Sequence, residues 1–125
     1  MTCLSLGNLH TVVFSDRVDD IDMEKVGPEF EYAPIFPDRT NTEFIRVVNR
    51  RTIRMRVWER GTGETLACGT GACAAAIAAV KRGLCDINCD ITVKTLGGDL
   101  VVNVSENNVT LTGNAVLSFE GSKKI

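Results

Sequence analysis

Apolar and polar residues alternate along most of this chain, and that period-2 pattern indicates β-strands. Near the N-terminus, residues 2–15 alternate and then become apolar at 12–14, which predicts one or two strands around a turn at Gly7 and Asn8. The same turn region carries the only histidine of the chain, His10. The chain is therefore expected to begin as a strand or hairpin with one titratable ring beside its turn.

Further strands are predicted in the middle and at the end of the chain. Residues 42–48 and 52–59 form two candidates, and the second has an apolar residue at every second position from Ile53. Continuing that alternation places Glu59 on the apolar face. The C-terminal third predicts four strands joined by turn residues, over 90–95, 99–105, 108–113 and 115–121.

Two helices are expected between these strands. Asp20 or Asp22 provides an N-cap for a short amphipathic helix, which the glycine-proline pair at 27–28 should end or restart. A second helix is predicted from about residue 70 to residue 82, with basic residues in its last turn and Gly83 as its C-terminal cap.

The second helix has no polar face, because Ala72 to Val80 are nine consecutive apolar residues. A helix of this kind must be covered on every side, and its many alanines let the surrounding elements approach closely. The sequence therefore predicts an α+β fold in which a strongly curved, mostly antiparallel sheet wraps around a central apolar helix.

Composition fits one soluble globular domain over residues 1–125, with 44% hydrophobic and 24% charged residues. The formal net charge of -2 gives no indication of a surface for nucleic acid or for an anionic membrane. The nine-residue apolar run is short of the ~20 residues that span a bilayer, and no secretion signal follows Met1. We therefore expect a cytoplasmic protein with small-molecule or protein partners, and no nucleic-acid or membrane partner.

The cysteines are odd in number and no secretion signal accompanies them, which argues against a disulfide framework. They are Cys3, Cys68, Cys73, Cys85 and Cys89. Their C-x4-C and C-x3-C spacings differ from the C-x2-C spacing that is typical of tight zinc sites, so we expect reduced thiols and no metal. Cys73 lies within the apolar helix and is expected to be an inert core thiol, as are Cys85 and Cys89.

Cys68 stands directly before the N-terminus of the apolar helix. Free backbone N–H groups and the positive end of the helix dipole favour a negative charge there, so the thiol pKa should be lowered and Cys68 is a candidate base or nucleophile. Gly69 and Gly71 leave the same N–H groups open and Thr70 adds a hydroxyl, which together predict a carboxylate or phosphate cradle. The residues alone fit an inert buried cysteine beside a tight turn equally well.

Two common phosphate-binding motifs are excluded. Residues 69–74 fit G-x-G-x-x-A, but Asp90 begins the strand after the helix, whereas a dinucleotide-binding unit needs an acid at the end of that strand. The chain also has no G-x-x-x-x-G-K-[ST] sequence.

Six arginines between positions 46 and 60 mostly predict solvated strand faces. Arg60 is the exception, because it follows Glu59 into the glycine turn that leads to Cys68. Such a Glu-Arg pair suits a zwitterion, with the carboxylate meeting an ammonium and the guanidinium meeting a carboxylate, and it suits an ordinary structural ion pair equally well.

The run RVWERGTGETLACGTGACAAA, residues 56–76, resembles the active-site signature of the diaminopimelate epimerase family. Two other segments agree in order: GNLH at 7–10 resembles the family's G-N-P-H, and FPDRTNTEF at 36–44 resembles its F-P-x-R-T-N-x-E-F. Leu9 stands where the family usually has proline. The resemblance covers essentially the whole chain, but only as the C-terminal half, or domain, of a family member.

The resemblance implies a fold with a sheet around a central helix, and an isomerase that needs neither pyridoxal phosphate nor another cofactor or metal. Such an enzyme inverts the α-carbon of diaminopimelate in lysine biosynthesis, with one cysteine removing a proton and a second cysteine delivering one. Carried over by position, Cys68, Glu59 and His10 are the implied catalytic residues. The implied substrate-binding residues are Asn8, Asn41, Glu59, Arg60, Gly69 and Thr70.

The second catalytic cysteine of the resembled family belongs to the N-terminal half, and no second copy of its motif occurs in these residues. We therefore expect an incomplete site that is inactive alone and needs that half as its partner. An apolar inter-domain face also suggests a possible homodimer. The alternatives are a related amino-acid racemase and, from a different functional class, a non-catalytic domain that binds an amino acid or a protein.

Overall fold

A computed structural model describes residues 2–6, 8–35, 39–66, 68–106, 108–112 and the backbone of 122–124. The strand expected at 115–121 lies outside these ranges. Within the described part of the chain, neither helix has the length and apolar character that a membrane span requires.

The elements follow the predicted order closely. The strands are β1 (Thr2–Ser5), β2 (Leu9–Phe14), β3 (Asn41–Asn49), β4 (Thr52–Glu59), β5 (Gly63–Thr65), β6 (Asp90–Thr95), β7 (Gly98–Val104), β8 (Val109–Thr112) and β9 (Ser122–Lys124). The helices are a 3₁₀ turn η1 (Val18–Asp20), α1 (Met23–Glu31) and α2 (Gly69–Lys81). The predicted strands at 42–48, 52–59 and 90–95, and the second helix, are confirmed to within a residue at each end.

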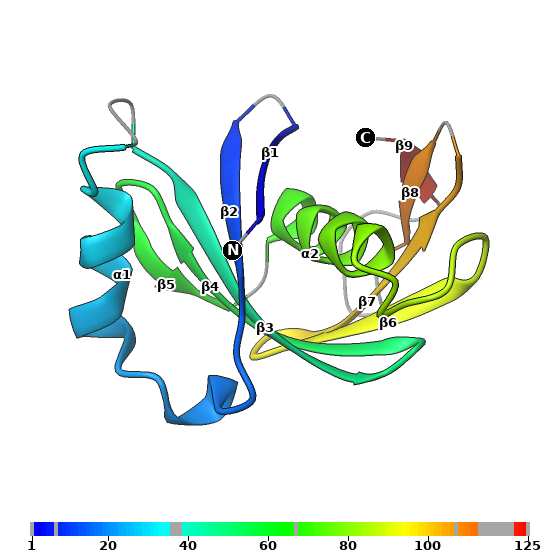
Figure 1. The fold of residues 1–125 in the computed structure, drawn as a ribbon, viewed down its shortest axis with the longest axis horizontal. Coiled ribbons are helices and arrows are strands. Elements are labelled where there is room, and N and C mark those ends of the chain that lie inside the picture. The colour runs from blue at the N-terminus through cyan, green and yellow to red at the C-terminus, as the bar shows by residue number, and fades with distance from the viewer. Residues whose placement is uncertain are drawn as a thin grey trace.

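One curled sheet joins the described strands in the order β1-β2-β3-β4-β6-β7-β8-β9, with β5 paired to β4. Most neighbours are antiparallel, while β2 with β3 and β4 with β6 are parallel. The two parallel pairs are the places where a helix connects the strands, because a parallel connection must cross over the sheet. In Figure 1 the sheet curves around α2, and α1 lies on its outer side.

The core is built around α2, as the absence of a polar face on this helix requires. Its residues 71–76, 78 and 79 are buried, and they pack with Ile45, Ile53, Val93 and other apolar residues from the concave face of the sheet. Alanine side chains keep the helix close to the strands, and Gly83 with φ of 74° ends the helix where an L side chain would be strained. The predicted α+β architecture is therefore confirmed.

The outer face of the sheet carries a second, smaller core under α1. Val18, Met23, Phe44 and Trp58 are buried there. The prediction that α1 would end at positions 27–28 is wrong, since the helix continues through Pro28 to Glu31. A proline ring normally clashes with the Cβ of the residue before it, and Gly27 has no Cβ. Packing of Gly27 on Trp58 also stabilises the last turn of α1.

We predict that Gly27→Ala destabilises the fold, although alanine is the better helix former. A Cβ at position 27 would lie 2.2 Å from Trp58 Cδ2, so the indole must move. Overpacking of this kind costs about 1–3 kcal/mol in the free energy of unfolding, measurable by urea denaturation. Lys25→Ala, at an exposed position of the same helix, is the control and should change that free energy by less than about 0.5 kcal/mol. Equal stability of both variants would contradict the packing argument.

Candidate active site

Cys68 is the N-cap residue of α2, with extended backbone angles (φ -141°, ψ 114°). Its Sγ accepts a hydrogen bond from the backbone N–H of Gly71 at 3.3 Å and lies 3.5 Å from Thr70 Oγ1. Its carbonyl accepts the first intrahelical bond, from Ala72 N at 2.8 Å. The half-buried thiol is thus fixed at the start of the helix, as the sequence predicts.

The backbone N–H groups of Gly69 and Thr70 come before that of Ala72, which makes the first intrahelical hydrogen bond. Neither therefore has an intrahelical acceptor, and both can bind an anion. The glycines also have a packing role that the sequence did not indicate. A Cβ at Gly69 would lie 2.8 Å from Leu111 Cδ2, and one at Gly71 would lie 3.0 Å from Glu43 Oε2 and 3.3 Å from Cys68 Sγ. The missing side chains therefore admit neighbouring protein groups, in addition to keeping the helix start open.

His10 and Glu43 form a buried pair near this helix start. Both side chains have no exposed surface, and His10 Nδ1 lies 2.9 Å from Glu43 Oε2. Burial raises the pKa of Glu43 despite the hydrogen bond and charge of His10, which lower it. The sequence analysis associates His10 with the turn at Gly7, but the structure places it inside β2.

Three titratable side chains lie on the apolar face of three adjacent strands, at the strand ends nearest the N-terminus of α2. His10 is on β2 with Val12, Glu43 is on β3 with Ile45, and Glu59 is on β4 with the residues that alternate from Ile53. Electrostatic interactions connect Glu43 with both His10 and Glu59, and Cys68 with both carboxylates. The same alternation along β3 puts Glu43 on the apolar face with Ile45, which is the sequence signal for this residue.

The turn after β4 is held by side chains from outside it. Asn41 Oδ1 accepts from Arg60 N at 2.6 Å, and Thr65 Oγ1 donates to Glu59 Oε2. The structure therefore brings Asn41, Glu59 and Arg60 together where β3 begins and β4 ends. Asn8 is exposed just before β2, and its carbonyl accepts from Leu6 N at 3.0 Å.

Glu31 is a second buried carboxylate that the sequence analysis missed. Its Oε1 accepts from Trp58 Nε1 at 2.9 Å, and its Oε2 accepts from Gly61 N at 2.9 Å and from Arg39 at 3.1 Å. It therefore anchors α1 to the turn that carries Arg60. No local signal marks this residue, because it follows the glycine-proline pair that was expected to end the helix.

The expected lowering of the Cys68 pKa is wrong in this structure. Burial raises the pKa of the thiol, and the charges of Glu59 and Glu43 add to that effect, while the bonds from Thr70 and Gly71 N oppose it. Desolvation therefore outweighs the helix terminus. Burial also raises the pKa of Cys73 to about 12, as expected for an inert core thiol.

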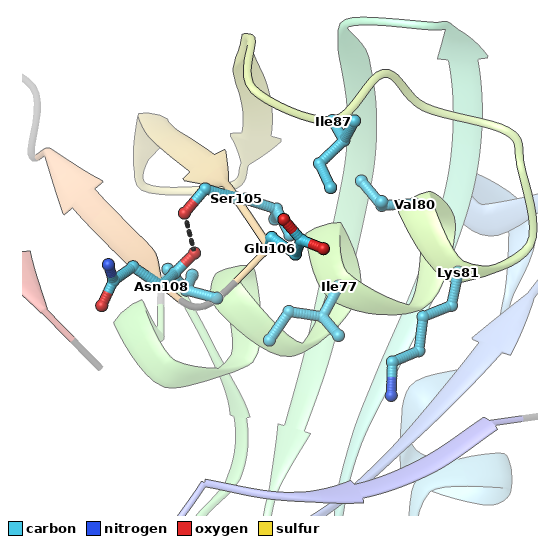
Figure 2. A pocket seen from close by; sticks show the side chains of 9 residues that line it. Ile77, Val80, Lys81, Ile87, Ser105, Glu106 and Asn108 are labelled. Carbon is cyan, nitrogen blue, oxygen red and sulfur yellow. Dashed lines mark hydrogen bonds between the residues drawn. The ribbon is translucent and has the colours of Figure 1, made fainter.

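A separate cavity of about 350 Å³ lies along the far half of α2. It is lined mainly by apolar residues, among them Ile77, Val80 and Ile87, with Lys81 and Glu106 at its sides (Figure 2). Ser105 Oγ donates to the carbonyl of Asn108 at its rim. Ile77 is nine residues beyond Cys68, about 13 Å along the helix axis, so this cavity is distinct from the thiol site.

Comparison with solved structures supports the fold. A phenazine biosynthesis protein of the PhzF family from Bacillus anthracis has a TM-score of 0.60 at 26% identity, covering 84% of this chain and 34% of that one. Its counterpart from Enterococcus faecalis has a TM-score of 0.64 at 15% identity, covering 90% of this chain and 42% of that one.

Comparison of sequences gives the family. The diaminopimelate epimerase of Acetivibrio thermocellus is 53% identical over 97% of this chain, and that of Desulfovibrio desulfuricans is 50% identical over 97%. This chain covers only 43% and 42% of those two proteins, so it spans less than half of their length. The sequence profile described as diaminopimelate epimerase matches residues 2–118, and the chain belongs to that family.

Proposed function

We propose that this chain is the C-terminal domain of a diaminopimelate epimerase and supplies one of its two acid/base cysteines, Cys68. The observation that carries the proposal is the position of this thiol. It caps a rigid buried helix, and the open amides of Gly69 and Thr70 follow it directly. A substrate carboxylate on those amides would hold the α-carbon next to the sulfur atom.

The proposed reaction is a proton exchange at the α-carbon. A thiolate on one face removes the α-hydrogen as a proton, and the electron pair is delocalised into the substrate carboxylate. A thiol on the opposite face then gives its proton to the same carbon, which inverts the centre. The amides at the helix start stabilise the negative charge that develops on the carboxylate, so the chemistry needs no pyridoxal phosphate.

The neighbouring side chains fit the remaining parts of such a substrate. Glu59 offers a carboxylate for an ammonium group, and Arg60 offers a guanidinium for a carboxylate. Asn41 orients the turn between them through its bond to Arg60 N. Asn8, exposed before β2, is a further proposed substrate contact.

In this chain alone, the raised pKa favours the protonated thiol of Cys68 at neutral pH. That protonation state suits the proton donor of the pair. The base of the pair would be the cysteine of an N-terminal half, which corresponds to the part of the curated relatives that this chain does not cover. We place the assembled enzyme in the cytoplasm, in lysine biosynthesis.

The proposal predicts that the chain alone does not convert LL- to meso-diaminopimelate. A chimera in which it replaces the matching segment of the Acetivibrio thermocellus relative should convert it. Cys68→Ala in that chimera should lower kcat at least about 100-fold, since general acid/base catalysis contributes about 10²–10⁴-fold. Conversion is measured by chromatography, and α-hydrogen exchange by deuterium uptake from D₂O.

The control is Cys3→Ser, which changes an exposed cysteine of β1 and should leave kcat within about twofold. Full activity of the Cys68→Ala chimera would overturn the assigned role. Epimerisation by the chain alone would overturn the need for a second half.

A second prediction concerns the reactivity of the thiol in the chain alone. Because the pKa of Cys68 is raised, its thiolate fraction near pH 7 is smaller than that of a model thiol, and iodoacetamide should label it more slowly. Peptide mass spectrometry across pH 6–10 separates Cys68 from the other cysteines. Cys73 should stay unlabelled in the folded protein, because it is buried and its pKa is raised to about 12. Labelling of Cys68 at pH 7 as fast as that of the model thiol would contradict the prediction.

A further inference from the structure

Glu43 is a fully buried carboxylate beside the proposed site, and neither the substrate nor the proton chemistry described above uses it. Its Oε2 lies 2.9 Å from Nδ1 of the equally buried His10. Its other oxygen, Oε1, makes no hydrogen bond within the described ranges, and the same holds for His10 Nε2. Leaving one polar atom of each residue without a partner lowers the stability of the fold. Stability therefore does not explain why this pair is buried.

The second observation is the distance from this pair to the helix start. A Cβ at Gly71 would lie 3.0 Å from Glu43 Oε2 and 3.3 Å from Cys68 Sγ, so the carboxylate and the thiol both lie close to this glycine. The negative charge of Glu43 also acts on Cys68 directly. The carboxylate is therefore the physical link between the imidazole on β2 and the thiol on α2.

We infer that Glu43 is a positioning residue of the thiol site: it fixes the imidazole of His10 through Nδ1 and adds a negative charge, besides that of Glu59, next to the Cys68 thiol. This inference rests on the proposed role of Cys68. With Nδ1 held by Glu43, the opposite ring nitrogen Nε2 is the only one left for any other partner. Glu43 acts through these neighbours and does not touch the substrate.

The titratable and polar groups that act on the thiol come from two strands and the helix. They are Glu43 from β3, Glu59 from β4, and Thr70 and Cys73 from α2, while His10 from β2 contacts Glu43. The negative charge of the Glu43 carboxylate opposes ionisation of the thiol. Removal of that charge should let Cys68 ionise at lower pH.

The first test uses nuclear magnetic resonance of the chain as it stands. His10 is the only histidine, so the ring ¹⁵N signals belong to one residue. We expect the ring to carry a proton on Nδ1, donated to Glu43, and Glu43→Gln to weaken that preference. A wild-type ring protonated on Nε2 alone would overturn the inference, whether or not the variant folds.

The second test measures iodoacetamide labelling of Cys68 against pH in Glu43→Gln. We expect labelling at pH 7.5 to rise roughly three- to tenfold, because a like charge next to the thiolate has been removed. Glu64→Gln is the matched control, since it removes a hydrogen-bonded carboxylate of the same sheet that pairs with Arg56 and not with the thiol. The control should show the wild-type profile.

An unchanged Cys68 profile in a folded Glu43→Gln protein would overturn the inference, as would an equal shift in the Glu64 control. Both tests use the chain alone and need no epimerase activity. Failure of the chimera to epimerise would therefore count against the proposed function, while a failed ring or labelling test would count only against the role of Glu43.

Discussion

Burial of α2 is the constraint on which the rest of the structure depends. A helix with no polar face can exist only inside a sheet that curls around it, and small alanine side chains set how closely the two approach. The strands then end near the N-terminus of the helix, on the side where their apolar faces point inward. Packing around the helix thus brings functional groups on β2, β3 and β4 close to the helix start at Cys68.

Opposing effects act on the pKa of Cys68 at the helix start, and the local sequence does not show which of them is stronger. The amides at the N-terminus stabilise a thiolate, whereas burial and two nearby carboxylates oppose it. The opposing effects are stronger in this structure, so the helix terminus moderates the pKa of Cys68 without lowering it below the ordinary value. Groups added by a second half of the site, or by a bound substrate, would act on this balance.

Much of the fold could be predicted from sequence, because alternation and apolar periodicity are local signals. The bounds of α2, β3, β4 and β6 follow from them to within a residue at each end. The end of α1 could not be predicted, since it depends on the contact of Gly27 with Trp58, a residue from another element. The candidate site could be predicted only in part: Cys68, Glu59 and His10 were selected from motifs, and Glu43 also lies in one, FPDRTNTEF, but its pairing with His10 depends on the contact of β2 with β3. Glu31 lies in no motif, and its role depends on contacts of α1 with Trp58 and Gly61.

Glu31 and Glu43, the two buried carboxylates that were not predicted as site residues, differ in how completely their oxygens are hydrogen-bonded. Both oxygens of Glu31 accept hydrogen bonds, from Trp58, Gly61 and Arg39, and these bonds join α1 to the turn after β4. Glu43 uses one oxygen on His10 and keeps the other unpartnered within the described residues. Folding favours complete pairing of buried polar groups, so incomplete pairing beside a reactive thiol indicates a group retained for the behaviour of its neighbours.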